Sequence, residues 1–281
     1  MTTTPQPLPL GPLIAGAFNR VRYAIPQHVA LTYVYILPVL LLFVPGLFDD
    51  VLATFITHEP VGGALWQSLL FLVLMVIWGS AIVVVWYRLT LLGPGEFLRL
   101  DVAAGLDRTI RFIGISLLVG IITGVAFLLM IMATALVVVF TSKALAPLAF
   151  AVSMAVALAT GLRFLPSLAA VPLGRRIPLS ASWQLTRNKG GRLLMAALAL
   201  VLPVAILSGV VDGLVMHSLY GAAPDESAPL AEAVSYMRSS FLISVLLAPL
   251  SCAATAFVCG LGAEVYARLV GAPLDVRGME V

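Results

Sequence analysis

The sequence predicts an all-α fold: a polytopic membrane protein with six transmembrane helices and short cytoplasmic interfacial helices. Of the 281 residues, 61% are hydrophobic and only 10% are charged, and the mean hydropathy is +1.09. Several apolar runs reach the roughly 20 residues that a helix needs to cross about 30 Å of hydrocarbon. Basic residues are concentrated in alternate connections between these runs. No soluble core buries so much apolar surface, and lipid is therefore the predicted solvent.

Six apolar runs define the spans, which we predict at 29–48, 64–87, 112–140, 145–171, 193–217 and 240–269. A cytoplasmic segment with an interfacial helix (1–28) precedes this transmembrane domain (29–269), and a cytoplasmic tail (270–281) follows it. The third run is longer than one crossing needs. A tilted helix is the simpler interpretation, and two half-helices are the alternative. Residues 1–12 contain no Lys or Arg, so we expect the first span to remain in the protein rather than to be cleaved as a signal peptide.

The Lys and Arg positions predict the orientation in the membrane. Apart from Arg163, which lies within a span, only Lys143 and Arg238 of the 16 basic residues fall on the second face. The connections on the first face contain Arg20, Arg22, Arg88, Arg99, Arg108, Arg111, Arg175, Arg176, Arg187, Lys189, Arg192, Arg268 and Arg277. The positive-inside rule makes this face cytoplasmic, so both termini are expected in the cytoplasm and the protein in a bacterial inner membrane. Because the basic residues are scattered between apolar spans, no nucleic acid partner is predicted.

The cytoplasmic connections share one order of residues, in which an Arg near the end of a span is followed by a Gly, a Pro and an amphipathic stretch. Three such stretches lie at 13–23, 97–108 and 179–188. We predict three units, each with one interfacial helix and two spans, related by rotation about the membrane normal. The alternative is that these are ordinary span ends, since Gly and Pro are common in membrane helices. The basic residues expected at the interface, in contact with anionic lipid, are Arg88, Arg108, Arg175, Arg176 and Arg187.

Arg163 is the most informative single residue, because it interrupts an otherwise apolar span, where a charge costs a few kcal/mol or more. We predict Glu264 as its partner, at a comparable depth in the last span. Glu264 also precedes Arg268 by four residues, a favourable helical spacing for an ion pair. Three roles for Arg163 stay open: linking the helices, contacting a substrate or lipid headgroup, or reaching the interface by snorkelling.

Residue types that carry catalysis are not grouped in this sequence. No His, Cys, Asp or Glu residues have metal-ligand spacing, and no glycine-rich phosphate loop or nucleophile motif is present. Asp212 and His217 are five residues apart, which places them on different faces of a helix. Cys252 and Cys259 are expected to be packing residues. We therefore predict no enzyme, no cofactor and no metal site.

Two segments carry a family resemblance. The first is Trp86 to Gly93, and the second continues from Arg163 through Pro178 to the sequence Ser182-Trp183-Gln184-Leu185-Thr186-Arg187-Asn188. They resemble uncharacterised six-span proteins of alphaproteobacterial inner membranes and, more distantly, the membrane domain of glycerophosphodiester phosphodiesterases. The resemblance implies the architecture, but it carries over no catalytic residue, because the chemistry of those enzymes belongs to a separate soluble barrel.

These observations together predict a non-catalytic membrane protein, an accessory or assembly factor that binds membrane lipid, particularly anionic lipid, or a partner protein in a membrane complex. The alternative is a small transporter or channel with Arg163 and Glu264 beside a central cavity. An enzyme acting on a lipid is the least favoured hypothesis, because it requires polar groups from several spans to converge.

Overall fold

The computed structural model describes residues 8–38, 40, 64–95, 102–140, 146–220 and 230–270, and within these ranges it contains helices and no strand. The helices are α1 (Leu10–Arg22), α2 (Ile25–Ile36), α4 (Ala64–Leu92), α5 (Val102–Phe140), α6 (Ala146–Leu162), α7 (Leu165–Ala170), the 3₁₀ turn η3 (Val171–Leu173), α8 (Leu179–Leu185), α9 (Gly190–Tyr220) and α10 (Leu230–Val270). The predicted all-α class is confirmed.

Five segments of the described chain are long and apolar enough to cross a membrane: Leu65–Leu92, Val102–Ala135, Ala146–Leu173, Gly190–Val215 and Val245–Val270. Each overlaps one of the predicted spans from the second to the sixth. Of the predicted first span, 29–48, the structure describes only the part formed by α2 and the residues just after it, and the rest lies outside the described residues. The class of membrane protein is therefore confirmed with five candidate spans.

The third predicted span is one continuous helix rather than two half-helices. Helix α5 contains 39 residues, which corresponds to a length of about 58 Å at 1.5 Å per residue. The prediction of a separate interfacial helix at 97–108 is wrong for the described part of that stretch, because residues from Val102 onward belong to α5. No Pro separates Val102 from the apolar run, and Gly105 lies within the continuous helix, so nothing ends the helix between them. The other two interfacial stretches do form separate helices, α1 and α8.

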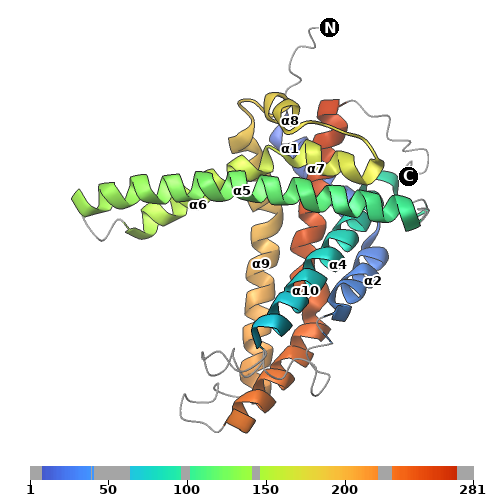
Figure 1. Ribbon diagram of the computed structural model, residues 1–281, viewed down its shortest axis with the longest axis vertical. Helices are drawn as coiled ribbons and strands as arrows, with labels where there is room; N and C mark the ends of the chain where they lie inside the picture. Colours follow the sequence, from blue (N-terminus) through green and yellow to red (C-terminus); the bar gives the residue numbers. More distant parts are fainter. Residues whose placement is uncertain are drawn as a thin grey trace.

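The spans are not all parallel (Figure 1). Helices α9 and α10 pack side by side along the long axis, and α4 and α2 pack against α10, whereas α5 and α6 form a hairpin that runs across this direction and projects to one side. The hairpin contacts the bundle near one end, through α4, α7, η3 and α9.

Helix α10 contacts most of the other helices, including α1, α2, α4, α7 and α9. Small residues make this possible because they let helix backbones approach closely. A Cβ atom on Gly260 would lie 2.9 Å from the carbonyl oxygen of Ala17 in α1, and one on Gly262 would lie 2.8 Å from the ring of Tyr87 in α4. The last turns of α10 are accordingly the best buried part of the molecule, with Ala263 and Tyr266 fully covered.

Two glycines end helices in the manner that the shared connections predicted. Gly93 has φ +82° and donates its N–H to the carbonyl of Leu89. Gly174 has φ +73°, and the bonds from Gly174 N–H to Val171 and from Arg175 N–H to Ala170 form a Schellman motif. Only glycine adopts such a positive φ without steric cost. The helices therefore stop where the sequence places Gly93 and Gly174.

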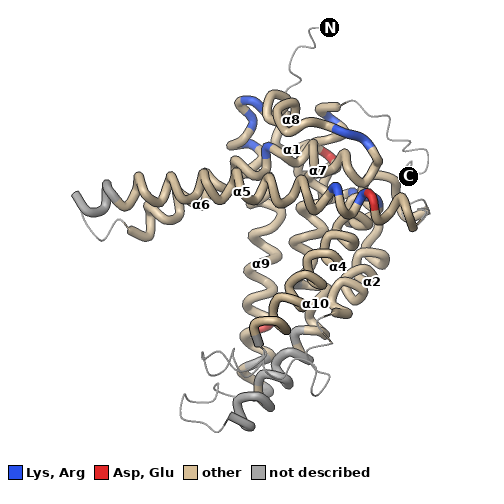
Figure 2. The backbone as a smooth tube through the Cα atoms, viewed as in Figure 1, with Lys and Arg blue, Asp and Glu red and all other residues tan. Residues whose placement is uncertain are grey.

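The charged residues of the described chain are strongly segregated (Figure 2). Lys and Arg gather at the end of the bundle that carries α1, α7 and α8, while the opposite part of α9 carries an acidic residue. The shafts of the helices between these ends are apolar and outward-facing, with Leu129, Ile206 and Leu246 each more than half exposed. Apolar outer faces and one basic end are typical of helices that cross a lipid bilayer.

Candidate functional site

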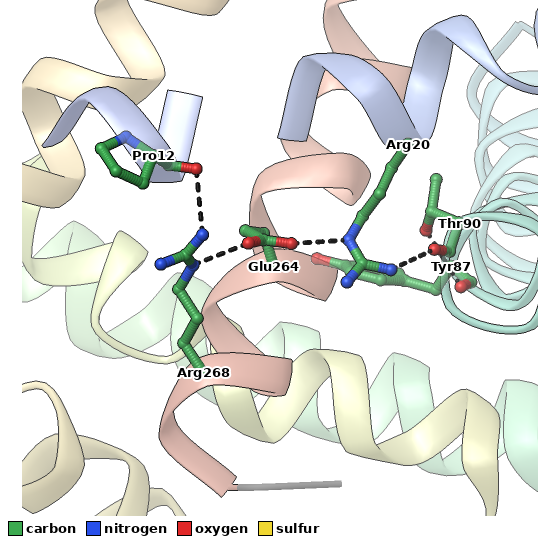
Figure 3. A network of polar contacts seen from close by, with 6 residues as sticks. All are labelled: Pro12, Arg20, Tyr87, Thr90, Glu264 and Arg268. Carbon is green, nitrogen blue, oxygen red and sulfur yellow. Dashed lines mark hydrogen bonds and ion pairs between the residues drawn. The ribbon is translucent and has the colours of Figure 1, made fainter. Parts of the chain in front are cut away.

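The basic end contains three groups of polar side chains, of which the first surrounds Glu264 (Figure 3). The carboxylate of Glu264 accepts from Arg20 Nε at 2.8 Å through Oε2 and from Arg268 Nε at 2.6 Å through Oε1. Arg20 also donates to the carbonyl of Thr90 at 3.0 Å, and Arg268 donates to the carbonyl of Pro12 at 3.1 Å. We call Arg20, Glu264 and Arg268 the Glu264 cluster. It links α1, α4 and α10.

The Glu264 cluster is a packed junction. Glu264 is 8% exposed, and a Cβ atom on Gly16 of α1 would collide with its carboxylate. Glycine at this position lets α1 lie directly on the acid, and Leu13 and Ala17 on the same face of α1 are fully buried. Because both carboxylate oxygens already accept a charge-assisted bond from an arginine, the geometry fits a structural link between helices better than a ligand site.

The second group surrounds Arg163, and it does not include Glu264, so the predicted pairing of Arg163 with Glu264 is wrong. The guanidinium carbon lies 3.2 Å from the centre of the Trp183 ring, and Nη2 donates to the carbonyl of Trp183 at 2.9 Å. The Arg163 carbonyl accepts hydroxyl bonds from Ser182 at 2.9 Å and Thr186 at 3.1 Å. Arg163 thereby ties the end of α6 to α8.

The local backbone explains why Arg163 does not continue a helix. Helix α6 ends at Leu162, residues Arg163 and Phe164 form a turn, and α7 begins at Leu165 with Pro166 in its first turn. Proline has no N–H to donate back into the preceding turn. The chain changes direction at Arg163, and its side chain reaches α8 rather than the interior of the bundle.

The third group is an open cleft of about 490 Å³ between α5 and the connection that follows η3. Four arginines line it: Arg108 and Arg111 from α5, and Arg175 and Arg176 from the connection. Its apolar lining includes Ile115, Leu118, Ile177 and Leu179. We call this the arginine cleft. Its four cations and apolar walls suit a ligand that is anionic at one end and apolar at the other.

Hydrogen bonds to the backbone hold the walls of the arginine cleft in place. The carbonyl of Pro172 accepts from Arg108 Nη1 at 2.8 Å and from Arg88 Nη1 at 3.1 Å. The side chain of Arg108 also lies against Gly174, where a Cβ atom would be 3.5 Å from Nη2. The Schellman motif at Gly174 then directs Arg175 and Arg176 away from the helix axis. Arg88, predicted at the interface, is instead buried at 5% exposure, beneath the cleft.

Among the described residues, few acidic side chains balance the charges of the arginines in the cleft. Arg111 Nε pairs with Asp107 Oδ1 at 2.8 Å, in an exposed pair one helical turn apart. Arg175 donates to the hydroxyl of Tyr266 at 3.3 Å, which leaves its charge uncompensated. Arg176 is exposed and has no ion-pair partner within the described part of the chain. The cleft is therefore a site of positive potential.

The remaining predicted residues lie outside these groups. Arg187 is exposed beside α8, next to Asn188, whose φ of 61° turns the chain into α9. Lys189 is buried, and burial, together with the neighbouring charge of Arg192, lowers the pKa of its ammonium group. Asp212 accepts a bond from Ser208 at 3.4 Å within α9.

Sequence reasoning missed two partners and one site. The sequence indicates Arg20 only as a marker of topology and Trp183 only as part of the family motif, although each contacts a residue that the sequence singles out. The arginine cleft joins residues more than 60 positions apart, and the one available signal was the tandem Arg175-Arg176 directly after a helix-ending glycine. In the described residues, no group of three or more His, Cys, Asp and Glu side chains is arranged to hold a metal ion.

Comparison of the chain with protein-family models, with curated proteins and with solved structures finds no match. The fold and the site define an α-helical membrane protein with at least five candidate spans and a basic cleft at one end. The resemblance to six-span alphaproteobacterial inner-membrane proteins stays a prediction.

Proposed function

We propose that this chain is a non-catalytic inner-membrane protein that binds anionic phospholipid in the arginine cleft. The observation that carries the proposal is the combination of four arginines and apolar side chains in one cleft of about 490 Å³. Arginine binds phosphate through planar, bidentate hydrogen bonds, and basic pockets between membrane helices suit anionic headgroups. The apolar lining favours a lipid over a soluble anion, because a soluble anion gains nothing from it.

The topology is part of the same proposal. We infer six spans with both termini in the cytoplasm, which places the arginine cleft at the cytoplasmic surface, where anionic lipids create a negative potential. Three arginines at or near the ends of α4, α6 and α10 support the three-unit arrangement, since each donates to a main-chain carbonyl of another segment: Arg88 to Pro172, Arg163 to Trp183 and Arg268 to Pro12. Gly271, the glycine that follows Arg268 in the shared order of residues, lies outside the described residues.

The biological role that we favour is that of an accessory or assembly factor in a membrane complex. The apolar hairpin α5–α6, which projects from the bundle in Figure 1, supports this role because it offers extended helix surface to lipid or to a partner helix. The alternative of a transporter or channel drew on a central site shared by Arg163 and Glu264. Those two residues have separate partners, so that alternative has lost the observation that motivated it.

Lipid binding by purified protein tests the proposal. In nanodiscs of phosphatidylcholine with a minor fraction of phosphatidylglycerol, we expect native mass spectrometry to detect bound phosphatidylglycerol at ratios well above its share of the bilayer. The double variant Arg175→Gln/Arg176→Gln removes two charges, each worth about 1 kcal/mol near an anionic surface, so the apparent affinity should fall roughly thirtyfold. The sequence also predicts Arg187 at the interface, but this exposed arginine does not line the cleft. Arg187→Gln is therefore the control for the loss of a surface charge, and it should lower the affinity much less than the double variant does. Equal binding of both lipids by the wild type, or unchanged binding by the double variant, would refute the proposal.

A further inference from the structure

The four arginines of the arginine cleft form two pairs, one on α5 and one on the connection after η3. We propose that the cleft selects a lipid with two phosphodiester groups, of the cardiolipin type, over lipids with one phosphate, each arginine pair binding one phosphate. This inference rests on the proposed function, because it names the lipid class that the same cleft would bind.

One pair lies on α5. Arg108 and Arg111 are three residues apart, a spacing that puts two side chains on the same face of a helix. Arg108 uses Nη1 for the carbonyl of Pro172, and Arg111 uses Nε for the carboxylate of Asp107. A guanidinium has five N–H donors, so each arginine keeps donors for a phosphate. The bond to Pro172 holds Arg108 beside the segment that leads into the second pair.

The second pair lies on the connection between η3 and α8. Arg175 and Arg176 directly follow Gly174, whose left-handed conformation ends the helical turn and turns the chain out of it. Arg175 is anchored to the hydroxyl of Tyr266 at 3.3 Å, which holds it without neutralising it. Both residues are exposed toward the cleft, so two separate arginine pairs face one opening.

The charge of the cleft favours two phosphates, and its volume is that of a ligand site. Four guanidinium groups line the cleft, and among the residues that the structure describes Asp107, paired with Arg111, is the acid that compensates one of them. One phosphodiester would leave most of this positive charge unbalanced, whereas two would compensate the three charges that remain after Asp107 more closely. A cleft of about 490 Å³ lies in the range of sites for whole organic ligands and far exceeds the ~30 Å³ volume of one water molecule.

The apolar lining fits acyl chains on either side of such a headgroup. Ile115 and Leu118 continue along α5 from one pair, and Ile177 and Leu179 continue from the other. A lipid in which two phosphatidyl groups are joined by one glycerol has chains that leave the headgroup from both phosphates. Each phosphate can therefore lie against one arginine pair while its chains follow the adjacent apolar residues.

Competitive binding at equal phosphate concentration tests this inference. With the protein in phosphatidylcholine nanodiscs, we expect cardiolipin to bind about thirtyfold more tightly than phosphatidylglycerol, as two additional arginine contacts imply. Arg111→Gln and Arg176→Gln each remove one member of one pair, and either should bring the two affinities to within a few-fold. Arg187→Gln should keep the full preference, and circular dichroism and gel filtration should confirm that all variants are folded.

The outcomes separate the two proposals. Equal affinity per phosphate for cardiolipin and phosphatidylglycerol, both above phosphatidylcholine, would overturn the two-phosphate selection and leave the proposed function intact. Binding of neither anionic lipid would overturn both proposals. A third arm uses glycerol 1,3-bisphosphate as a soluble probe with two phosphates and no acyl chains. Displacement of cardiolipin by an equimolar amount of this compound would overturn the assignment to a lipid, because the apolar lining would then contribute nothing.

Discussion

The Glu264 cluster and the arginine cleft lie at the same end of the molecule, and arginine side chains have opposite roles in them. In the cluster, Arg20 and Arg268 share one buried carboxylate, and the exposed fraction of the Arg20 side chain is only 13%. In the cleft, Arg175 and Arg176 are exposed and no acid accepts from either in the described chain. The comparison teaches that a neighbouring acid decides whether arginine holds helices together or remains available to an anion.

The first prediction tests whether Glu264 holds its cluster together, and it has the largest expected effect. Glu264→Ala leaves Arg20 buried without its counter-charge, and breaking a buried pair in this way costs about 3–5 kcal/mol. We expect a large fall in the thermal unfolding midpoint of the detergent-solubilised protein. Asp107→Asn, which breaks an exposed pair, is the control and should change the midpoint little. Similar midpoints for the two variants would mean that the cluster is not a structural link.

The second prediction concerns the close approach of α1 to Glu264. Gly16→Val places side-chain atoms where the carboxylate lies, so the pair with Arg20 must shift or break. Overpacking of this kind costs about 1–3 kcal/mol, and the unfolding midpoint should fall. Gly11→Ala is the matched control, since a Cβ atom at Gly11 would meet nothing within 4 Å. A midpoint for Gly16→Val equal to that of the control would contradict the packing of α1 on Glu264.

The third prediction tests whether Arg163 has a structural role distinct from those of the Glu264 cluster and the arginine cleft. Arg163→Lys keeps the charge but loses the planar contact with Trp183 and the geometry of the bond to its carbonyl, so we expect a loss of about 1–2 kcal/mol in stability. Lipid binding in the arginine cleft should be unchanged. The two measurements are the thermal midpoint and the phosphatidylglycerol affinity. A change in affinity without a change in midpoint would place Arg163 in a ligand site instead.

The fourth prediction has the smallest expected effect on stability. It tests whether a neighbouring acid reduces the availability of an arginine in the cleft to an anion. Asp107→Asn removes the acid beside the cleft, so anionic lipid should bind more tightly, by a factor of roughly five if one surface charge is worth about 1 kcal/mol. The unfolding midpoint should stay within the change expected for an exposed pair. Titration of phosphatidylglycerol into wild type and variant measures the difference. A weaker affinity in the variant would show that Asp107 positions Arg111 for the ligand.

Much of the fold was predictable because it depends on composition and on contacts near in sequence. The spans from the second to the sixth follow from long apolar runs, the pair Glu264–Arg268 follows from the geometry of one helical turn, and the ends of α4 and η3 follow from Gly93 and Gly174. The pairing of Arg163 with Glu264 failed, because similar depth in the membrane does not specify which neighbours a helix has.

The sequence by itself determined that this is a helical membrane protein with most of its basic residues in alternate connections. A segment that crosses hydrocarbon must satisfy its own backbone hydrogen bonds and present an apolar surface, and charged side chains are favoured outside it. Only the tertiary structure decided that Arg20 reaches Glu264 across 244 positions of sequence, and that α5 and the connection after η3 face each other across a cleft. The physical reason is that these contacts depend on the close approach of helices at glycines such as Gly16 and Gly260, which no local pattern of residues encodes.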